Sequence, residues 1–512
     1  MLDMSLLFPV LIAQRAINPP VASIAVSLPP RPYDTRRKFG TIALVVRLFE
    51  RQPRTSRHTA HPEHRTIGND YLELLNDRIS GVELLIVMVL VAILIAPFSC
   101  WRTQIEQRQT LNVSVFGDPP HFKNLKKIAS DFERDHNNIR VVLDHTYVGE
   151  EYKTKVLASA QAGAATDVIY LHWSMVTEIA SKNTLLPLDD LIEHDNYDMD
   201  DYFPGSTEAY TYNGRLYGIP FKGSTMVLFY NKDLFDAEGL AYPNDDWTWK
   251  EFLDAAIRLT KYEGGRVIQI GCIPYDPASW IWSGGGNYGS DDLDSLSFTD
   301  PRTIQAIQFF VDLRNKYKVT PRKMDLKQAD ITRVNVFESG RVGMEVAGPW
   351  KLQVYAPIRN LNWDVALFPK GPAGRQTRYA GTGYAISSTT TQKDIAWKYV
   401  KHLCGVETAN LLAKELDDLP ARRSVAYSDV FLREDYGWNM KTFLRAMEPD
   451  ISTIRIFPRS VYWGWVKQRF DEHLEQAGVN NEDISLMMRQ VEQMTQEHIA
   501  ERKRADRHSL TD

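Results

Sequence analysis

Residues 111–117 read LNVSVFG, and residues 132–171 read FERDHNNIRVVLDHTYVGEEYKTKVLASAQAGAATDVIYL. The first stretch alternates apolar and polar residues, which predicts a strand. From Leu125, apolar residues recur at i, i+3, i+4 and i+7, which predicts a helix with one apolar face. A second alternation begins at Ile139, and DVIYLHW (167–173) has the pattern of a short buried strand. This order of strands and helices predicts an α/β fold with mostly parallel sheets covered by helices.

The same pattern continues through the second half of the chain. Thr248 and Glu251 predict a capping box that opens a helix through Lys261. Asp300 followed by Pro301 predicts an N-cap and a first helical residue. Further helical patterns cover 392–404 and 461–504. Since 111–504 contains neither a repeat nor a Pro/Gly/Ser linker, we expect one unit of two lobes.

The composition narrows the class of protein. The chain has 512 residues, enough for two or three domains, and a formal charge of −5, which gives no basic field for nucleic acid. Three cysteines are too few for a disulfide framework, and no two have metal-ligand spacing. Cys272 and Cys404 are expected to be buried thiols, with a disulfide between them as the alternative. We expect neither a metal nor a cofactor.

An apolar segment, LLIVMVLVAILIAPFSC, covers residues 84–100. Its uncharged run is intermediate in length between a signal-peptide core and a membrane-spanning helix. The end, Pro97-Phe98-Ser99-Cys100, resembles a bacterial lipoprotein box, although Pro97 departs from the Leu of that pattern. Three interpretations of this segment remain open: a lipid on Cys100, a cleaved signal, and an uncleaved anchor over 84–99. Each of them places the chain after residue 100 outside the cytoplasm.

Residues 1–80 have no sustained period and are rich in Arg and Pro. We expect a disordered or misassigned leader over 1–80, followed by the signal or anchor segment over 81–100.

Several separated motifs carry a resemblance to a known family. In addition to 132–171, they are LLPLDDLI (185–192), RLYGIPFKGSTMVLFYNKDLFDAEGL (215–240), WIWSGGGNYG (280–289), FESGRVGMEVAGPW (337–350), GTGYAISSTTTQKDIAWKYVKHL (381–403) and LPARRS (419–424). From about 111 to 500 the chain resembles the extracellular solute-binding proteins of family 1, which include the maltose- and oligosaccharide-binding proteins of ABC importers.

This resemblance implies a two-lobed, periplasmic-binding-protein-like fold of type II, whose lobes close on a ligand at a hinge. The hinge crossings are expected near Phe221–Thr225, near Thr382–Ala385 and after Pro420–Ser424. Lobe one is expected to hold 108–222 and 384–430, and lobe two 225–381 and 431–504.

A sugar site needs aromatic rings that stack on the sugar and polar groups that bind its hydroxyls. Trp350 is the best aromatic candidate, because it directly follows the predicted strand GMEV and the matching family Trp stacks on ligand. The other aromatic candidates are Trp280, Trp282, Trp173, Tyr462 and Trp463. The polar candidates are Asp118, Glu150, Ser224, Thr225, Gly381, Thr382, Gly383 and Arg422. For each one, a place in the core, in a turn or at a helix cap is the competing interpretation.

The resemblance implies a binding protein that captures a sugar, an oligosaccharide or a glycoside, by lobe closure. We expect it to be a monomer and, from the segment that ends at Cys100, to be tethered to the membrane. It would deliver the sugar to the permease subunits of an ABC importer. The sequence contains no G-x-S-x-G, HExxH or P-loop motif, so we expect no enzyme activity. Two alternatives remain: a membrane-attached carbohydrate-active enzyme, and the ligand-sensing subunit of a membrane receptor.

Overall fold

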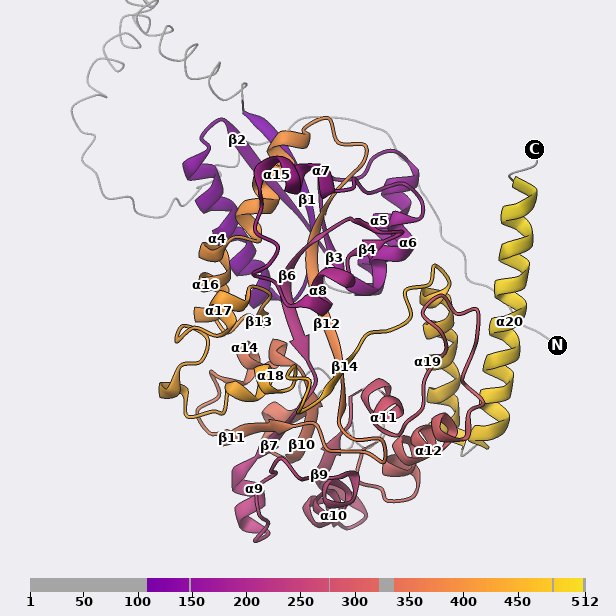
Figure 1. The fold of residues 1–512 in the computed structure, drawn as a ribbon. Coiled ribbons are helices and arrows are strands. Elements are labelled where there is room, and N and C mark those ends of the chain that lie inside the picture. The colour runs from indigo at the N-terminus through magenta and orange to yellow at the C-terminus, as the bar shows by residue number, and fades with distance from the viewer. Residues whose placement is uncertain (1–107, 147–148, 276, 322–335, 481–482, 510–512) are drawn as a thin grey trace, which may run out of the picture. The chain divides into compact units, whose positions relative to one another are not determined.

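A computed structural model describes residues 108–146, 149–275, 277–321, 336–480 and 483–509 (Figure 1). These residues all belong to one structural unit, Ile95–Asp512. The leader, the apolar segment and Cys100 lie outside the described residues, so the expectations for them stay predictions.

The first sheet has the strand order β13-β6-β12-β3-β1-β2, and β14 pairs with β12. Its strands are β1 (Gln109–Phe116), β2 (Ile139–Thr146), β3 (Val168–His172), β6 (Ile219–Thr225), β12 (Gln376–Ile386), β13 (Leu419–Pro420) and β14 (Thr453–Arg455). β1 runs parallel to β2 and to β3, as the opening stretch of the sequence predicts.

α4 (Pro119–Asp135) and α5 (Gly149–Gln161) are the helices that connect β1, β2 and β3. α4 begins where it does because the Asp118 side chain accepts a hydrogen bond from the His121 N–H at 3.2 Å, and Pro119 takes the first helical position. Leu125 and Phe132 on its predicted apolar face are buried against the sheet. The N-terminus of α4 is thereby held next to the carboxyl end of β1.

The second sheet has the order β11-β7-β10-β9-β8. Its strands are β7 (Val227–Asn231), β8 (Lys261–Glu263), β9 (Arg266–Ile273), β10 (Val342–Ala347) and β11 (Trp363–Leu367). A separate pair is formed by β4 (Thr211–Tyr212) and β5 (Arg215–Leu216). The chain passes from the first sheet to the second between Thr225 and Val227, and β12 belongs to the first sheet from Gln376 on.

The prediction of mostly parallel sheets is wrong in this detail, because both sheets are mixed. In the first sheet, β6 and β12 pair antiparallel with each other, β12 with β3, and β13 with β6. In the second, only β9 and β10 pair parallel. The physical reason is that β12 brings the chain back from the second sheet and therefore runs opposite to its neighbours β3 and β6. A βαβ pattern in the sequence does not reveal such a returning strand.

Further helices pack around the two sheets, with α19 and α20 beside α12 (Figure 1). They are α6 (Val176–Ala180), α7 (Asp189–Asp195), α8 (Pro204–Glu208), α9 (Lys232–Ala237), α10 (Trp249–Leu259), α11 (Ala278–Ser283), α12 (Pro301–Asn315), α14 (Leu352–Tyr355), α15 (Lys393–Leu403), α16 (Val406–Lys414), α17 (Arg423–Ala426), α18 (Lys441–Arg445), α19 (Trp463–Asn480) and α20 (Ile484–Ser509). Short 3-10 turns are η1 (Trp173–Met175), η2 (Val336–Ser339), η3 (Pro349–Lys351) and η4 (Glu434–Tyr436).

The predicted helix starts are confirmed. Thr248 and Glu251 form the capping box of α10, and Asp300 caps α12 by accepting from the Arg302 N–H at 2.8 Å. α10 ends at Leu259 rather than Lys261, because Lys261 pairs in β8 against β9. The predicted helical stretch 461–504 forms two helices, α19 and α20, which pack on α12.

Cys272 and Cys404 are both free and buried, in two different hydrophobic clusters. The alternative of a disulfide between them is therefore not realised in this structure. Among the described residues, no helix is long and apolar enough to cross a membrane.

Candidate functional site

A pocket of about 320 Å³ lies where strand ends of both sheets meet, a size typical of sites for small molecules. From the first sheet and its flanking segments, its lining is Phe116, Gly117, Asp118, His121, Tyr170, His172, Lys222, Ser224, Arg378, Ala380, Gly381, Thr382, Asp417 and Asp418. Segments that follow strands of the second sheet add Tyr275, Trp350 and Gln353.

Two aromatic side chains form the apolar part of the pocket. Trp350 lies in η3, directly after β10, and is half-buried. Its ring centroid is 5.6 Å from that of Tyr275, which follows β9. A Cβ at Gly348 would lie 1.9 Å from the Trp350 ring, so only glycine lets this ring fold back over the chain. The Gly-Pro-Trp order therefore sets the position of the aromatic surface.

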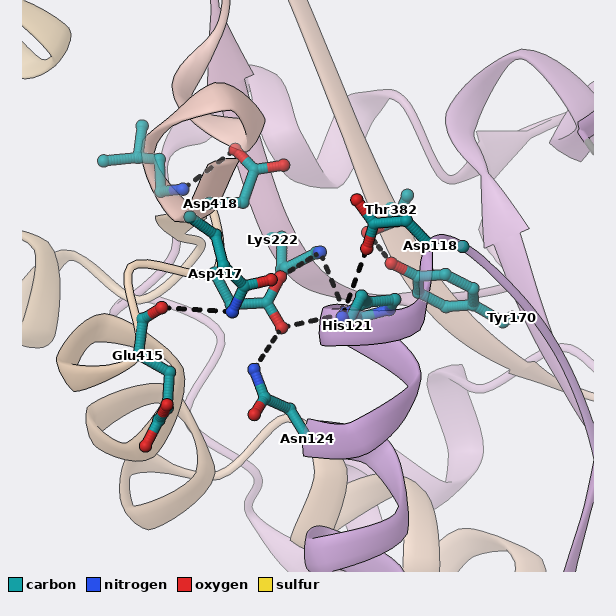
Figure 2. Close-up of polar contacts among 12 residues, drawn as sticks. Asp118, His121, Asn124, Tyr170, Lys222, Thr382, Glu415, Asp417 and Asp418 are labelled. Carbon is teal, nitrogen blue, oxygen red and sulfur yellow. Dashed lines mark hydrogen bonds and ion pairs between the residues drawn. The ribbon is translucent and has the colours of Figure 1, made fainter. Parts of the chain in front are cut away.

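Buried charged side chains form another part of the pocket, and Asp417 is at their centre (Figure 2). One of its carboxylate oxygens accepts from the His121 Nδ1–H and from the Asn124 amide, each at 2.8 Å. The other accepts from the Lys222 ammonium at 3.0 Å. Asp417 and Lys222 are only 5% and 8% exposed. The network joins α4, β6 and the turn before β13.

The charges in this network stabilise one another. Burial opposes ionisation of Asp417, but the Lys222 ammonium and the hydrogen bonds from His121 and Asn124 outweigh it and hold the pKa of Asp417 well below its usual range. Burial likewise disfavours the charged form of Lys222, yet Asp417 raises the pKa of that ammonium. Burial, followed by the Lys222 charge, lowers the pKa of His121, so its imidazole is neutral near pH 7.

Asp418 lies beside this network and is held separately. Its Oδ1 accepts from the Ser224 hydroxyl at 2.7 Å and from the Leu419 N–H at 2.9 Å. Burial raises the pKa of Asp418 to about 6, although Lys222 acts in the opposite direction. The pKa of Asp417 is thus lower than that of an ordinary aspartate, and the pKa of its neighbour Asp418 is higher.

Five of the predicted site residues line this pocket: Trp350, Asp118, Ser224, Gly381 and Thr382. Asp118 is exposed at the N-terminus of α4, while the Thr382 hydroxyl accepts from the Tyr170 hydroxyl at 2.7 Å. Ser224 from the first predicted hinge crossing thus lies in the same pocket as Gly381 and Thr382 at the second, together with Trp350.

The structure does not bring Trp280 or Trp282 to this pocket. Both lie in helix α11, where residues two apart point in different directions, so the extended geometry that would align them is absent. Trp280 is 0% exposed and its Nε1 donates to the Pro274 carbonyl at 3.1 Å, which makes it a core residue. Trp282 donates to Asn287 at 3.2 Å and lines a second pocket of about 310 Å³ with Arg302 and Arg455.

The remaining aromatic candidates also pack inside the protein. Trp173 and Trp463 are buried, and both rings lie against Phe457, with centroids 5.4 and 4.9 Å away. Tyr462 is half-buried and packs edge-on against His498. The physical reason is that these rings connect η1, α19 and α20 through one hydrophobic cluster.

The polar candidates Thr225, Arg422 and Gly383 have structural partners instead of a place in the lining. Thr225 is buried and donates to the Phe443 carbonyl at 3.2 Å. Arg422 donates to the Cys404 carbonyl at 2.7 Å and pairs with Asp201 at 3.1 Å. A Cβ at Gly383 would lie 2.6 Å from the Ile219 carbonyl oxygen. The side chain of Glu150 lies outside the described part of the chain.

Sequence reasoning missed several charged or polar residues of the pocket, among them His121, Lys222, Arg378, Asp417 and Asp418. Two signals were present. Lys222 stands within the hinge motif IPFKGST, and the pair Asp417-Asp418 directly precedes LPARRS. Neither signal shows that positions so far apart in the chain meet.

Among the described residues, no group of three or more His, Cys, Asp or Glu could hold a metal ion. The acidic stretch near Asp291 is engaged in ion pairs, Asp291 with Arg459 at 2.7 Å and Asp294 with Lys503.

Comparison with known proteins agrees with this architecture. The family model described as bacterial extracellular solute-binding protein matches residues 119–409. The maltotriose-binding protein of Pyrococcus abyssi is 23% identical over 328 residues, covering 61% of this chain and 67% of that protein. The galactooligosaccharide-binding protein of Bacillus subtilis is 20% identical over 347 residues, covering 65% of this chain and 78% of that protein.

A solved structure shows the fold. The ABC substrate-binding protein of Listeria monocytogenes in complex with cycloalternan superposes with a TM-score of 0.70 at 21% identity, covering 77% of this chain and 99% of that one. The predicted two-lobed α/β fold of periplasmic binding proteins is therefore confirmed. The family model covers more than half of the length of this chain, and the chain therefore belongs to the bacterial extracellular solute-binding proteins.

Proposed function

We propose that this protein captures a sugar, an oligosaccharide or a glycoside, in the pocket around Trp350 and Asp417 and delivers it to an ABC importer. One observation carries the proposal: a single pocket combines an aromatic surface from one sheet with a buried hydrogen-bonding network from the other. Sugars present flat apolar faces edged by hydroxyls, so they need both kinds of surface.

The origin of the two surfaces supports capture by lobe closure. Tyr275 and Trp350 follow strands of the second sheet, whereas Asp118, Lys222 and Asp418 belong to segments of the first. A ligand that contacts both sets binds the closed arrangement more tightly than the open one, which is what closure requires.

The name of the family supports an extracytoplasmic location. We further propose that the protein is tethered to the outer face of the membrane, through a lipid on Cys100 or through 84–99, that it acts as a monomer, and that its partner is a permease. The permease would recognise the closed, sugar-loaded state.

A direct test uses the full chain purified in detergent and isothermal titration with glucose, galactose, maltose, maltotriose and a galactooligosaccharide. We expect saturable binding of at least one sugar, and chromatography of the recovered sugar should show it unchanged. Absence of binding across the panel contradicts the proposal, and release of shorter sugars would make the protein an enzyme.

A further inference from the structure

Asp418 occupies an unusual backbone conformation inside the pocket. Its φ is +73°, and Leu416 two residues earlier has φ +55°, both in the left-handed region that residues with side chains rarely adopt. Such conformations persist only where the surrounding structure enforces them, and they cluster at functional sites. This turn places two consecutive carboxylates, Asp417 and Asp418, in one wall of the pocket.

Within the described part of the chain, hydrogen bonds reach one oxygen of the Asp418 carboxylate and not the other. Oδ1 takes both hydrogen bonds, from Ser224 and Leu419, whereas Oδ2 has no partner among the residues that the structure describes. Oδ2 is not fully enclosed, and Asp418 lines the pocket, so we infer that a ligand in the pocket can reach this oxygen. The side chain is otherwise 8% exposed, so Oδ2 is a clamped acceptor rather than a mobile surface group.

Lys222 supplies hydrogen-bond donors in the same pocket as Asp418 Oδ2. An ammonium group has three N–H donors, and Asp417 takes one of them at 3.0 Å. The His121 Nδ1 lies 3.4 Å from the ammonium, but it carries its own proton toward Asp417 and does not accept. Lys222 also lies directly across the strand pair from Pro420, two residues after Asp418. Donors of Lys222 and an acceptor of Asp418 thus lie in the same part of the pocket.

We propose that Asp418 Oδ2 and Lys222 Nζ bind two neighbouring hydroxyl groups of the ligand and thereby select neutral sugars over phosphorylated or carboxylated ones. Oδ2 accepts from one hydroxyl, and the ammonium donates to the next. This inference rests on the proposed capture of a sugar.

The charge of the pocket explains the selection against anions. Its lining contains three carboxylates, Asp118, Asp417 and Asp418, and two cationic side chains, Lys222 and Arg378. Asp417 already neutralises Lys222, so an anionic substituent at this position would face the Asp418 carboxylate at low dielectric, in a lining where carboxylates outnumber cationic side chains three to two. A hydroxyl group, in contrast, completes the hydrogen bonding of both side chains.

The test compares the full-length wild type with Asp418→Asn, in detergent, by titration with maltotriose, galactose, glucuronate and glucose 6-phosphate. Asn keeps the size of the side chain but replaces the charged acceptor with a neutral amide. In Asp418→Asn, we expect the affinity for the tightest-binding neutral sugar to fall at least tenfold. The ratio of this affinity to that for glucuronate or glucose 6-phosphate should also fall at least tenfold. Asp429→Asn is the matched control, because Asp429 is exposed and absent from the lining, and both measures should stay within twofold.

Unchanged affinity and selectivity in a folded Asp418→Asn variant would overturn the inference while leaving the proposed function in place. A wild type that binds neither these sugars nor any sugar of the panel that tests the proposed function would overturn both. If Asp418→Asn does not fold, monodeoxy analogues of the bound sugar decide the question on the wild type. Two neighbouring hydroxyls should each contribute at least tenfold in affinity, and the absence of such a pair would refute the assignment.

Discussion

Trp350 differs from Trp280 in its surroundings, although both were predicted to touch ligand. Trp350 is half-buried in the lining of the pocket, and Trp280 is enclosed in the core of the second sheet. Trp350→Ala is expected to weaken sugar binding by about 2 kcal/mol, roughly thirtyfold in Kd, because a stacked ring is lost. The unfolding free energy without ligand should change by less than about 1 kcal/mol.

Trp280→Ala is the control for this variant. It is expected to lower the unfolding free energy by about 3–5 kcal/mol through the cavity that it leaves. Isothermal titration and urea unfolding measure the two effects. A large stability loss with unchanged affinity in Trp350→Ala would place that ring in the core.

The buried pair of Lys222 and Asp417 makes a prediction about stability. Removing one partner leaves an uncompensated buried charge, so Lys222→Met is expected to lower the unfolding free energy by about 3–5 kcal/mol at pH 7. The double variant Lys222→Met, Asp417→Asn removes both charges and should recover at least half of that loss. Urea unfolding of the two single variants and the double variant checks this, and strictly additive losses would contradict a coupled pair.

Asp418 makes a prediction about pH. Burial raises its pKa to about 6 in the folded protein, with Lys222 and Asp417 as the charged neighbours, whereas the ordinary value in an unfolded chain is about 3.9. The folded state therefore binds this proton more tightly, and the resulting stabilisation is complete below about pH 4 and lost as the pH rises through 6. The unfolding free energy of the wild type minus that of Asp418→Asn should fall by about 2 kcal/mol between pH 4 and pH 7.

Urea unfolding at several pH values measures this difference. A difference that stays constant, or that grows with pH, would mean that folding does not raise the pKa of Asp418.

At the scale of the element, β12 determines how closely the hinge strands approach. A register shift falls between Thr382 and Gly383, and a Cβ at Gly383 would lie 2.6 Å from the Ile219 carbonyl oxygen and 2.7 Å from the Tyr210 ring. Gly383→Ala is therefore expected to destabilise the protein by about 1–3 kcal/mol through overpacking of β12 against β6.

Gly205→Ala in α8 is the matched control for this element. A Cβ at Gly205 meets no atom within 4 Å, and alanine favours helices, so its stability should be unchanged or slightly raised. Thermal unfolding compares the two variants. Equal melting temperatures would show that β12 tolerates a side chain at position 383.

At the scale of the whole molecule, the proposed closure predicts a response to ligand. Sugar binding at a hundredfold excess over Kd should stabilise the protein by about 2.7 kcal/mol, because the ligand binds only the folded state. Closure should also reduce the radius of gyration in small-angle scattering. Stabilisation without any change in the radius would indicate a preformed pocket and contradict the closure mechanism.

Separated motifs carried the resemblance to the family. Local patterns in the sequence determined the order of strands and helices, the caps of α10 and α12, and the place of Trp350 after β10. These features depend on residues within one or two turns of each other. Alternation, capping and turn residues can therefore be read without knowing the rest of the fold.

Only the tertiary structure decided the direction of the returning strands, the burial of Trp280, and the meeting of His121, Lys222 and Asp417 in one network. His121 and Asp417 bond across 296 positions of the chain. No local period encodes which distant segments share a pocket, since burial and charge pairing depend on the packing of both sheets at once. The order of strands and helices was thus set by short-range chemistry, and the binding surface by long-range packing.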